Sequence, residues 1–337
     1  MKIFKLDKLW VKILAAVIAL IVILYVVSVG LSYLIYGRSL AATVNEYRYR
    51  HSNVNSIYVD EKSVQETLND RKTSNTGKYI MKDSVAFSVS VREDTINSTQ
   101  VYILNDTGEN DKAVIYIHGG AYINEPSKTT WEFADKIASE TGAEVIVPIY
   151  SLAPVYTYEK AYDEIENVLN SVVSGFAYDD ITIMGDSSGG GLAAGFCEYI
   201  GTLGRLQPGN LILISPWVDG TLSNENIKDY EDVDPLLCVY GLKKYAEAWA
   251  GNTPVEDYRI SPVNGDLACL KNVYIFTGTR EIFYPDNVLF YNKLVDAGVN
   301  AQLIRGTGLD HCWPVQDIPE AEKAISKITE VIKGTAE

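Results

Sequence analysis

Few residues of this sequence could bind a transition metal. Its four cysteines, Cys197, Cys238, Cys269 and Cys312, form neither a CxxC pair nor another close metal-ligand spacing. Their low density also argues against a disulfide framework, so we expect small, mostly buried thiols. We therefore expect no metal site, and because the chain has only three histidines, each imidazole can be considered individually.

Basic residues are also scarce. Lys and Arg number 29 against 44 Asp and Glu, a net charge of −15, and no basic stripe follows the first dozen residues. Such a chain repels phosphate backbones, so nucleic acid is not an expected partner. Hydrophobic residues at 47% and charged residues at 22% exclude a disordered, collagen-like or polytopic membrane chain. A length of 337 residues fits two domains or one decorated α/β domain.

One long uncharged run stands out near the N-terminus. Ile13 to Gly37 are 25 apolar or neutral residues, enough at about 1.5 Å per residue to cross a hydrocarbon core of about 30 Å. We expect a transmembrane anchor over residues 13–37; a cleaved signal peptide, with Ser39-Leu40-Ala41 as a weak cleavage site, is the alternative. The tail at residues 1–12 has a net charge of +3, and Arg38, Arg48 and Arg50 follow the run less densely. This asymmetry predicts a cytoplasmic tail and an extracytoplasmic remainder.

Beyond the anchor, short β-branched runs alternate with longer amphipathic stretches. This alternation predicts an α/β fold with a mostly parallel sheet and helices on both faces. The expected strands are Val85–Val91, Val101–Asn105, Ala113–Ile117, Glu144–Ile149, Ile181–Met184, Leu211–Ser215, Val273–Thr277 and Gln302–Arg305. The expected helices are Thr129–Glu140, Tyr158–Ser174, Gly190–Leu203, Tyr240–Ala250, Asn287–Ala297 and Pro319–Lys333.

Two segments fit this alternation poorly. Ala41 to Lys78 is polar and contains tyrosines, and Asp219 to Asp257 is acidic with irregular helical patches. Each could cover one edge of the sheet as a cap. We therefore predict a linker and N-terminal cap segment at 38–82, and a catalytic domain at 83–337 with a cap insertion at about 219–257.

The strongest chemical signal is a GxSxG motif between a strand and a helix. The strand Ile181–Met184 leads into Gly185-Asp186-Ser187-Ser188-Gly189 and then into a run of small residues. A nucleophile elbow needs this order, because the turn is so tight that the residues flanking the serine must be small. The motif predicts Ser187 as a nucleophile. The rival interpretation, a dinucleotide turn at Gly189–Gly195, lacks the acidic residue expected about twenty positions later.

A second loop could stabilise an oxyanion. The strand Ala113–Ile117 ends in His118-Gly119-Gly120-Ala121-Tyr122, where small residues follow a histidine. Backbone N–H groups of such a loop can point at a developing alkoxide, and preorganised donors of this kind contribute about 2.7 to 4 kcal/mol each in acyl transfer. We expect donors among Gly119, Gly120 and Ala121, together with Ser188, and we expect His118 to brace the loop.

The serine needs a base, and His311 is the histidine downstream of it. Glu281, which follows the strand Val273–Thr277, is the first choice for the carboxylate that orients His311. Asp286 and Asp310 are competitors, although side chains adjacent in sequence seldom face each other across a ring. His51 precedes the sheet and is expected at the surface. Cys312 has no neighbouring residue that would activate it.

Together these motifs resemble the hormone-sensitive-lipase-like branch of the α/β-hydrolase fold, also called the α/β-hydrolase-3 group. The match covers about Asp83 to Lys333. It also includes Tyr150-Ser-Leu-Ala-Pro154, Ser215-Pro-Trp-Val-Asp219, the Asp234-Pro235 pair, Ile260-Ser-Pro262 and Gly278-Thr-Arg-Glu281.

The resemblance implies a triad of Ser187, Glu281 and His311, with the oxyanion on the N–H groups of Gly120, Ala121 and Ser188. It also implies a cap built from the two irregular segments. Three residues depart from the family pattern: Ala121 replaces a third glycine, Ser188 an alanine and Glu281 an aspartate. The first two changes keep the N–H groups.

These expectations combine into a membrane-anchored serine hydrolase that cleaves carboxylic esters without a cofactor. Short to medium acyl esters are the substrates that the resemblance implies, and acetyl esters of a sugar or another envelope component are inferred from the expected location alone. A non-catalytic binding protein on the same fold and a serine peptidase or amidase are the alternatives.

Overall fold

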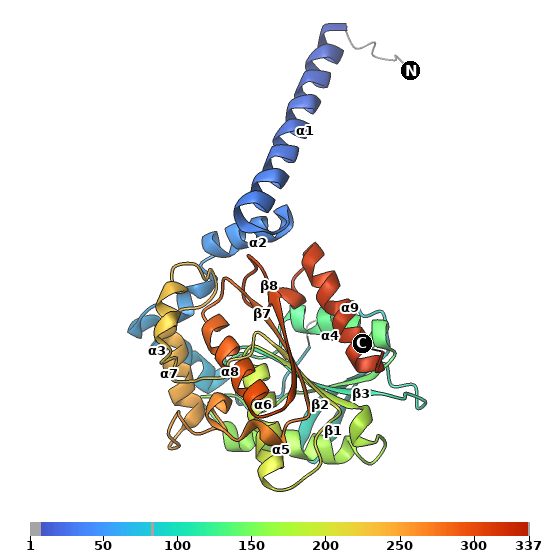
Figure 1. Ribbon diagram of the computed structural model, residues 1–337, viewed down its shortest axis with the longest axis vertical. Coiled ribbons are helices and arrows are strands. Elements are labelled where there is room, and N and C mark those ends of the chain that lie inside the picture. The colour runs from blue at the N-terminus through green and yellow to red at the C-terminus, as the bar shows by residue number, and fades with distance from the viewer. Residues whose placement is uncertain (1–7, 82–83, 336–337) are drawn as a thin grey trace.

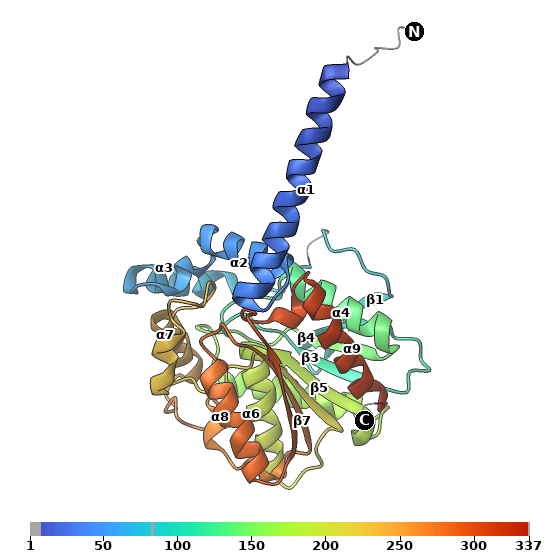
Figure 2. The ribbon, with the colours of Figure 1, turned by 45° about the horizontal axis from the view of Figure 1, so that its top comes forward.

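A computed structural model describes residues 8–81 and 84–335 (Figures 1 and 2). Among them is one sheet of eight strands in the order β1-β2-β4-β3-β5-β6-β7-β8. β1 and β2 form an antiparallel edge, β2 pairs antiparallel with β4, and the remaining strands are parallel. The mostly parallel sheet predicted from the sequence is therefore confirmed. The strands are Val91–Ile96 (β1), Thr99–Leu104 (β2), Ala113–Ile117 (β3), Glu144–Pro148 (β4), Ile181–Asp186 (β5), Asn210–Ile214 (β6), Asn272–Gly278 (β7) and Asn300–Gly306 (β8).

Helices cover both faces of this sheet. One face packs against α5, α6 and α8 through residues such as Ile165, Phe196 and Phe290, and the other against α4 and α9 through Ile137 and Ile328. The helices of the domain are Leu40–His51 (α2), Glu61–Ser74 (α3), Lys128–Thr141 (α4), Tyr158–Val172 (α5), Ser188–Thr202 (α6), Val239–Ala250 (α7), Tyr284–Asp296 (α8) and Pro319–Lys333 (α9).

One predicted strand is wrong. Val85 to Val91 is irregular up to its last residue, and the edge strand β1 begins only at Val91. Phe87 and Val89 pack against the core, which explains the alternating apolar pattern. The backbone N–H groups of Ser88 and Val89, however, donate to the Asp135 carboxylate on α4, at 2.8 and 3.2 Å. An alternating apolar pattern shows only that one side of a segment is buried. Here the Asp135 side chain accepts the backbone hydrogen bonds that a neighbouring strand would otherwise accept, so the segment is not a strand.

The apolar run forms one long helix, α1 (Lys8–Tyr36), which projects away from the domain in both views (Figures 1 and 2). Its segment Leu9–Tyr36 is long and apolar enough to cross a membrane, and the apolar window within it has no buried residue. Near the end of the helix, Ser32 is buried and bonds Thr43 of α2 at 2.6 Å. At about 1.5 Å per residue the helix is longer than a hydrocarbon core of about 30 Å. Residues 1–7 of the predicted tail and the predicted boundary at 82–83 lie outside the described residues.

The two irregular segments pack against each other beside the sheet. The first forms α2, the 3-10 turn Val54–Tyr58 and α3, and the second contains α7. Tyr58 meets Tyr245 of α7 edge to face at 5.4 Å, and the Tyr245 hydroxyl donates to the Ile57 carbonyl. Gly241 in α7 lies so close to Tyr58 that a Cβ at this position would collide with its backbone and side chain. A glycine in the helix therefore lets the two segments touch.

We expect Gly241→Ala to lower the melting temperature of the full chain. Alanine gains about 1 kcal/mol in helix propensity over glycine, but overpacking costs about 1 to 3 kcal/mol, so the collision outweighs the gain. A net loss of about 1 kcal/mol corresponds to a fall of about 2 to 4 °C, measurable by thermal unfolding in detergent. Gly175→Ala is the control, because its Cβ would meet only the Val172 carbonyl at 3.9 Å. Equal melting temperatures for the two variants would contradict the packing argument.

Candidate active site

Ser187 lies at a tight turn between β5 and α6, with φ 54° and ψ −123°. Few residues adopt this backbone conformation, which stores about 1 to 3 kcal/mol of strain. The turn also brings Gly189 against the carbonyl groups of Ile117 and His118, where a Cβ would not fit. The Ser187 N–H donates to the Ile214 carbonyl of β6 at 2.8 Å. The elbow geometry thus explains the small residues of the motif.

The structure brings Ser187, His311 and Glu281 into one series of hydrogen bonds. His311 Nε2 lies 2.9 Å from Ser187 Oγ, and His311 Nδ1 lies 2.6 Å from Glu281 Oε2. The three residues follow β5, β8 and β7, so the parallel strands deliver them to one edge of the sheet. This arrangement can transfer a proton from the serine to the imidazole.

Glu281 is fully buried and its second oxygen is also held. Glu281 Oε1 accepts hydrogen bonds from Thr277 Oγ1 and from the Gly278 N–H, the latter at 2.9 Å. The competing carboxylates face elsewhere: Asp286 accepts from Asn224 at 2.9 Å, and Asp310 lies 3.5 Å from Arg38. Glu281 is therefore the carboxylate positioned to orient His311.

Two features of the environment act on the His311 imidazole. Burial lowers the pKa of His311, and the Glu281 carboxylate on Nδ1 opposes this by raising it. A carboxylate on Nδ1 stabilises the imidazolium that forms when Nε2 takes a proton. Cys312 Sγ lies 3.4 Å from His311 Nε2, and burial raises the pKa of this thiol to about 11. Cys312 therefore stays protonated near neutral pH and is a poor nucleophile.

The loop after β3 presents two of the predicted N–H donors. Gly120 and Ala121 have positive φ values of 127° and 55°. Among the described residues, no hydrogen bond uses the N–H of either one. The Gly119 N–H, by contrast, donates to Asp186 Oδ1 at 3.0 Å, so Gly119 leaves the set of expected oxyanion donors. The Ser188 N–H is the first of α6, where backbone donors have no helical partner.

Buried groups hold this loop in place. His118 is fully buried, its Nδ1 lies 2.7 Å from the Gly119 carbonyl, and its ring stacks on Tyr150 at 4.5 Å. The Tyr150 hydroxyl donates to the His118 carbonyl at 2.9 Å. Asp186 accepts from the Tyr116 hydroxyl at 2.8 Å as well as from Gly119. Sequence reasoning missed this bracing role of Asp186, whose only signal was its place before the serine.

A cavity of about 870 Å³ lies over Ser187 and His311. Asn45 and Tyr49 of α2, Tyr58, and Leu236 from the second irregular segment contribute to its wall. The sequence predicted a cap but not these lining residues. His51 is exposed, as expected, and is not among the residues that line this cavity. Within the described residues, no group of three or more His, Cys, Asp or Glu side chains could hold a metal ion.

Comparisons with known proteins agree with this geometry. A family model described as alpha/beta hydrolase fold matches residues 114–315. An esterase of Acinetobacter venetianus is 32% identical over 224 residues, which are 64% of this chain and 73% of the relative. A triacylglycerol lipase of Mycobacterium tuberculosis is 28% identical over 221 residues, 65% of this chain and 45% of the lipase.

A crystal structure from Staphylococcus aureus, of a protein assigned as an esterase, superposes with a TM-score of 0.79 and 30% identity. The superposition covers 82% of this chain and 95% of that one. Family model, relatives and fold point the same way. The chain belongs to the α/β-hydrolase fold family, in the hormone-sensitive-lipase-like group that its motifs indicate.

Proposed function

We propose that this chain is a membrane-anchored serine hydrolase that cleaves carboxylic esters through an acyl-enzyme on Ser187. The observation that carries the proposal is the hydrogen-bonded series from Glu281 through His311 to Ser187 beneath an open cavity. Its family and its esterase and lipase relatives make the chain a carboxylesterase- or lipase-type α/β hydrolase. The serine, the acyl-enzyme, the anchor and the acyl preference belong to the proposal.

In the first half of the reaction, His311 Nε2 takes the proton of Ser187 Oγ while Oγ attacks the ester carbonyl carbon. The carbonyl oxygen becomes an oxyanion, which the N–H groups of Gly120, Ala121 and Ser188 stabilise because they are fixed before the charge develops. The carbon–oxygen bond to the alcohol then breaks. His311 returns its proton to the leaving alkoxide, which leaves an acyl group on Ser187.

In the second half, a water molecule replaces the alcohol. His311 takes a proton from this water as the oxygen attacks the acyl carbon, and the same N–H groups hold the second oxyanion. The ester bond to Ser187 Oγ breaks, the proton returns to Oγ, and the carboxylic acid leaves. Glu281 keeps its charge throughout and holds Nδ1 protonated, so that Nε2 is the basic nitrogen.

We propose short to medium acyl esters as substrates, with acetyl esters among them. A cavity of about 870 Å³ lies within the range of about 300 to 1,000 Å³ of small-molecule sites. Rates on matched ester and amide substrates would separate an esterase from a peptidase. Covalent labelling by a fluorophosphonate would separate an enzyme from a binding protein, since labelling needs an activated serine.

The anchor and its orientation complete the proposal. α1 offers no surface to the domain along most of its length, as expected of a helix that lies in lipid. The lysines of residues 1–12 favour a cytoplasmic tail, which places the catalytic domain outside the cytoplasm.

Ser187→Ala should abolish the hydrolysis of p-nitrophenyl butyrate, because removing the nucleophile of a serine hydrolase can cost up to about 10⁶ in kcat. The assay measures p-nitrophenol release by the purified full chain. The melting temperature of the Ser187→Ala variant should match that of the wild-type protein. Residual turnover above a few percent of wild type, from protein free of contaminating esterases, would remove Ser187 from the mechanism.

Glu281→Gln should lower kcat by at least about a hundredfold, since loss of the orienting charge costs about 10⁴ in well-studied triads. Glu281→Asp should recover part of the loss, because it restores the charge on a shorter stem. Asp286→Asn is the matched control: this residue is equally buried but bonds Asn224, and its loss should cost less than about tenfold. A crippling Asp286→Asn beside a mild Glu281→Gln would move the carboxylate role to Asp286.

A protease added to intact cells or spheroplasts should digest the catalytic domain before the membrane is broken. A cytoplasmic marker protein in the same cells should stay intact and serves as the control. Protection of the domain until lysis would show the opposite orientation, with the arginines after the span outweighing the lysines before it.

A further inference from the structure

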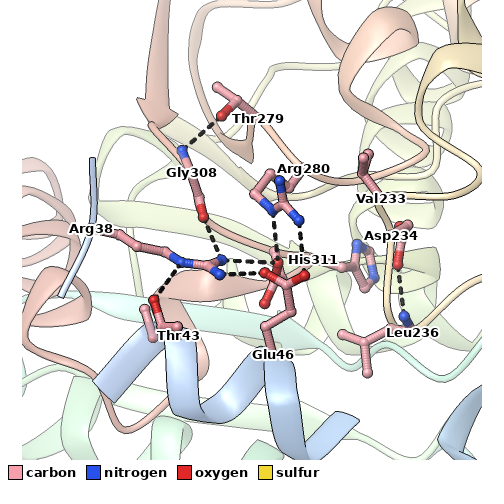
Figure 3. Close-up of polar contacts among 12 residues, drawn as sticks. Arg38, Thr43, Glu46, Val233, Asp234, Leu236, Thr279, Arg280, Gly308 and His311 are labelled. Carbon is pink, nitrogen blue, oxygen red and sulfur yellow. Dashed lines mark hydrogen bonds and ion pairs between the residues drawn. The ribbon is translucent and has the colours of Figure 1, made fainter. Parts of the chain in front are cut away.

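A cluster of charged side chains lies where α1 meets the domain (Figure 3). Arg38, Glu46, Arg50, Arg280 and Asp310 form this junction cluster, within which Arg38, Glu46 and Asp310 are only 3%, 7% and 3% exposed. Arg38 follows the anchor helix and Glu46 lies on α2, whereas Arg280 and Asp310 adjoin two residues of the proposed triad. The cluster therefore joins the membrane end of the chain to the proposed catalytic loops.

Glu46 is the centre of the cluster. Its carboxylate accepts hydrogen bonds from Arg38 Nη2, from Arg280 Nη2 at 2.8 Å and from Arg50 Nε at 2.8 Å. Burial raises the pKa of Glu46, but these hydrogen bonds from Arg280, Arg38 and Arg50 together lower it to about 2. The carboxylate is thus charged at neutral pH and bound to three separate segments.

The two residues that flank Glu281 in the sequence are each held by a hydrogen bond. Arg280, its predecessor, bonds Glu46. Ile282, its successor, donates its N–H to Asp234 Oδ2 at 2.9 Å. Arg50, which donates to Glu46, also donates from Nη2 to the carbonyl of Val233 at 2.7 Å. Val233 directly precedes Asp234 in the chain. The residues on either side of the proposed acid are therefore linked to α2: Arg280 directly through its guanidinium, and Ile282 indirectly through the Val233–Asp234 segment.

The remaining contacts hold the loop that carries His311. Arg38 Nη1 donates to the Gly308 carbonyl at 2.6 Å and lies 3.5 Å from Asp310 Oδ1. The Gly308 N–H donates to Thr279 Oγ1 at 2.8 Å, which links this loop to the one that carries Glu281. Figure 3 shows Arg38 between Thr43 of α2 and Gly308, with Glu46 beside Arg280.

We propose that Arg38 and Glu46 are positioning residues that fix Glu281 and His311 relative to each other. Because Arg38 follows the anchor helix, the turnover rate then depends on the position of the end of that helix against the domain. The proposal rests on the hydrolase function proposed above. Burying three charged side chains, Arg38, Glu46 and Asp310, has a large desolvation cost, and apolar side chains of similar size would often be as stable. Three of the groups that Arg38 and Glu46 contact, Arg280, Gly308 and Asp310, instead lie within three residues of Glu281 or His311, where a shift of about 1 Å can cost about a hundredfold in rate.

The test compares two glutamates in the purified full chain. Glu46→Gln removes the central charge and keeps the shape. Glu164→Gln is the matched control, because Glu164 is also helical, is also 7% exposed, and accepts hydrogen bonds from Ser151 at 2.6 and 2.8 Å rather than from the loops that carry Glu281 and His311. For both variants, kcat and KM for p-nitrophenyl butyrate are measured well below the melting temperature, which is measured in parallel.

We expect Glu46→Gln to lower kcat by about tenfold or more with KM within about threefold of wild type, because misplaced groups slow the chemical step more than binding. Glu164→Gln should keep kcat within about twofold at a comparable loss of melting temperature. A wild-type kcat for Glu46→Gln, or equal losses in both variants, would overturn the positioning role.

Arg38→Lys provides the second variant and decides the question where Glu46→Gln does not fold. Lysine keeps the positive charge but lacks the planar fork that reaches Gly308, Thr43 and Glu46 together, so kcat should fall while the chain stays folded. An unchanged kcat would count against the proposal. Ser187→Ala is assayed beside these variants: if it too keeps full activity, the proposed function itself fails.

Discussion

The close approach of backbone around Ser187 is the constraint on which the site depends. The Ser187 N–H bonds the end of β6, while the Ser187 carbonyl accepts from the Trp217 N–H at 3.0 Å. Gly189 meanwhile presses against the chain that leaves β3, where there is no room for a Cβ. The turn therefore fixes the serine, the first N–H of α6 and the oxyanion loop relative to one another. Glu281 and His311 follow β7 and β8 of the same parallel sheet, which places them beside this turn.

This constraint also explains which parts of the molecule could be predicted from the sequence. A strained elbow admits few residue types, so its motif is specific when it follows an apolar strand. Six of the eight strands, β2 to β7, are buried enough to appear as largely apolar runs, and these six and β8 each lie close to the expected range. Parallel strands end at one edge of a sheet, and Ser187, Glu281 and His311 each follow such a strand. Their positions in the sequence were therefore sufficient to predict that they lie close together.

Other features have no local signal. The Val85 to Val91 segment shows the alternation of a strand, but the Asp135 side chain takes its hydrogen bonds. Gly119 is as small as its neighbour Gly120, and only the position of Asp186 shows that its N–H is engaged. Glu46 and Arg280 are 234 residues apart, and each resembles a solvated charge on the surface of its own segment. Contacts of this kind depend on the packed fold.

The short connection between α1 and α2 has a consequence for the reach of the enzyme. Only Gly37, Arg38 and Ser39 separate the two helices, and Ser32 of α1 already bonds the Ser39 carbonyl and Thr43 Oγ1, at 2.9 and 2.6 Å. A flexible tether would let a domain sample many heights and tilts above a bilayer. With α1 in a membrane as proposed, this connection instead holds the cavity at a nearly constant height. The local concentration of esters within that thin layer, rather than their concentration in bulk solution, then sets the supply of substrate.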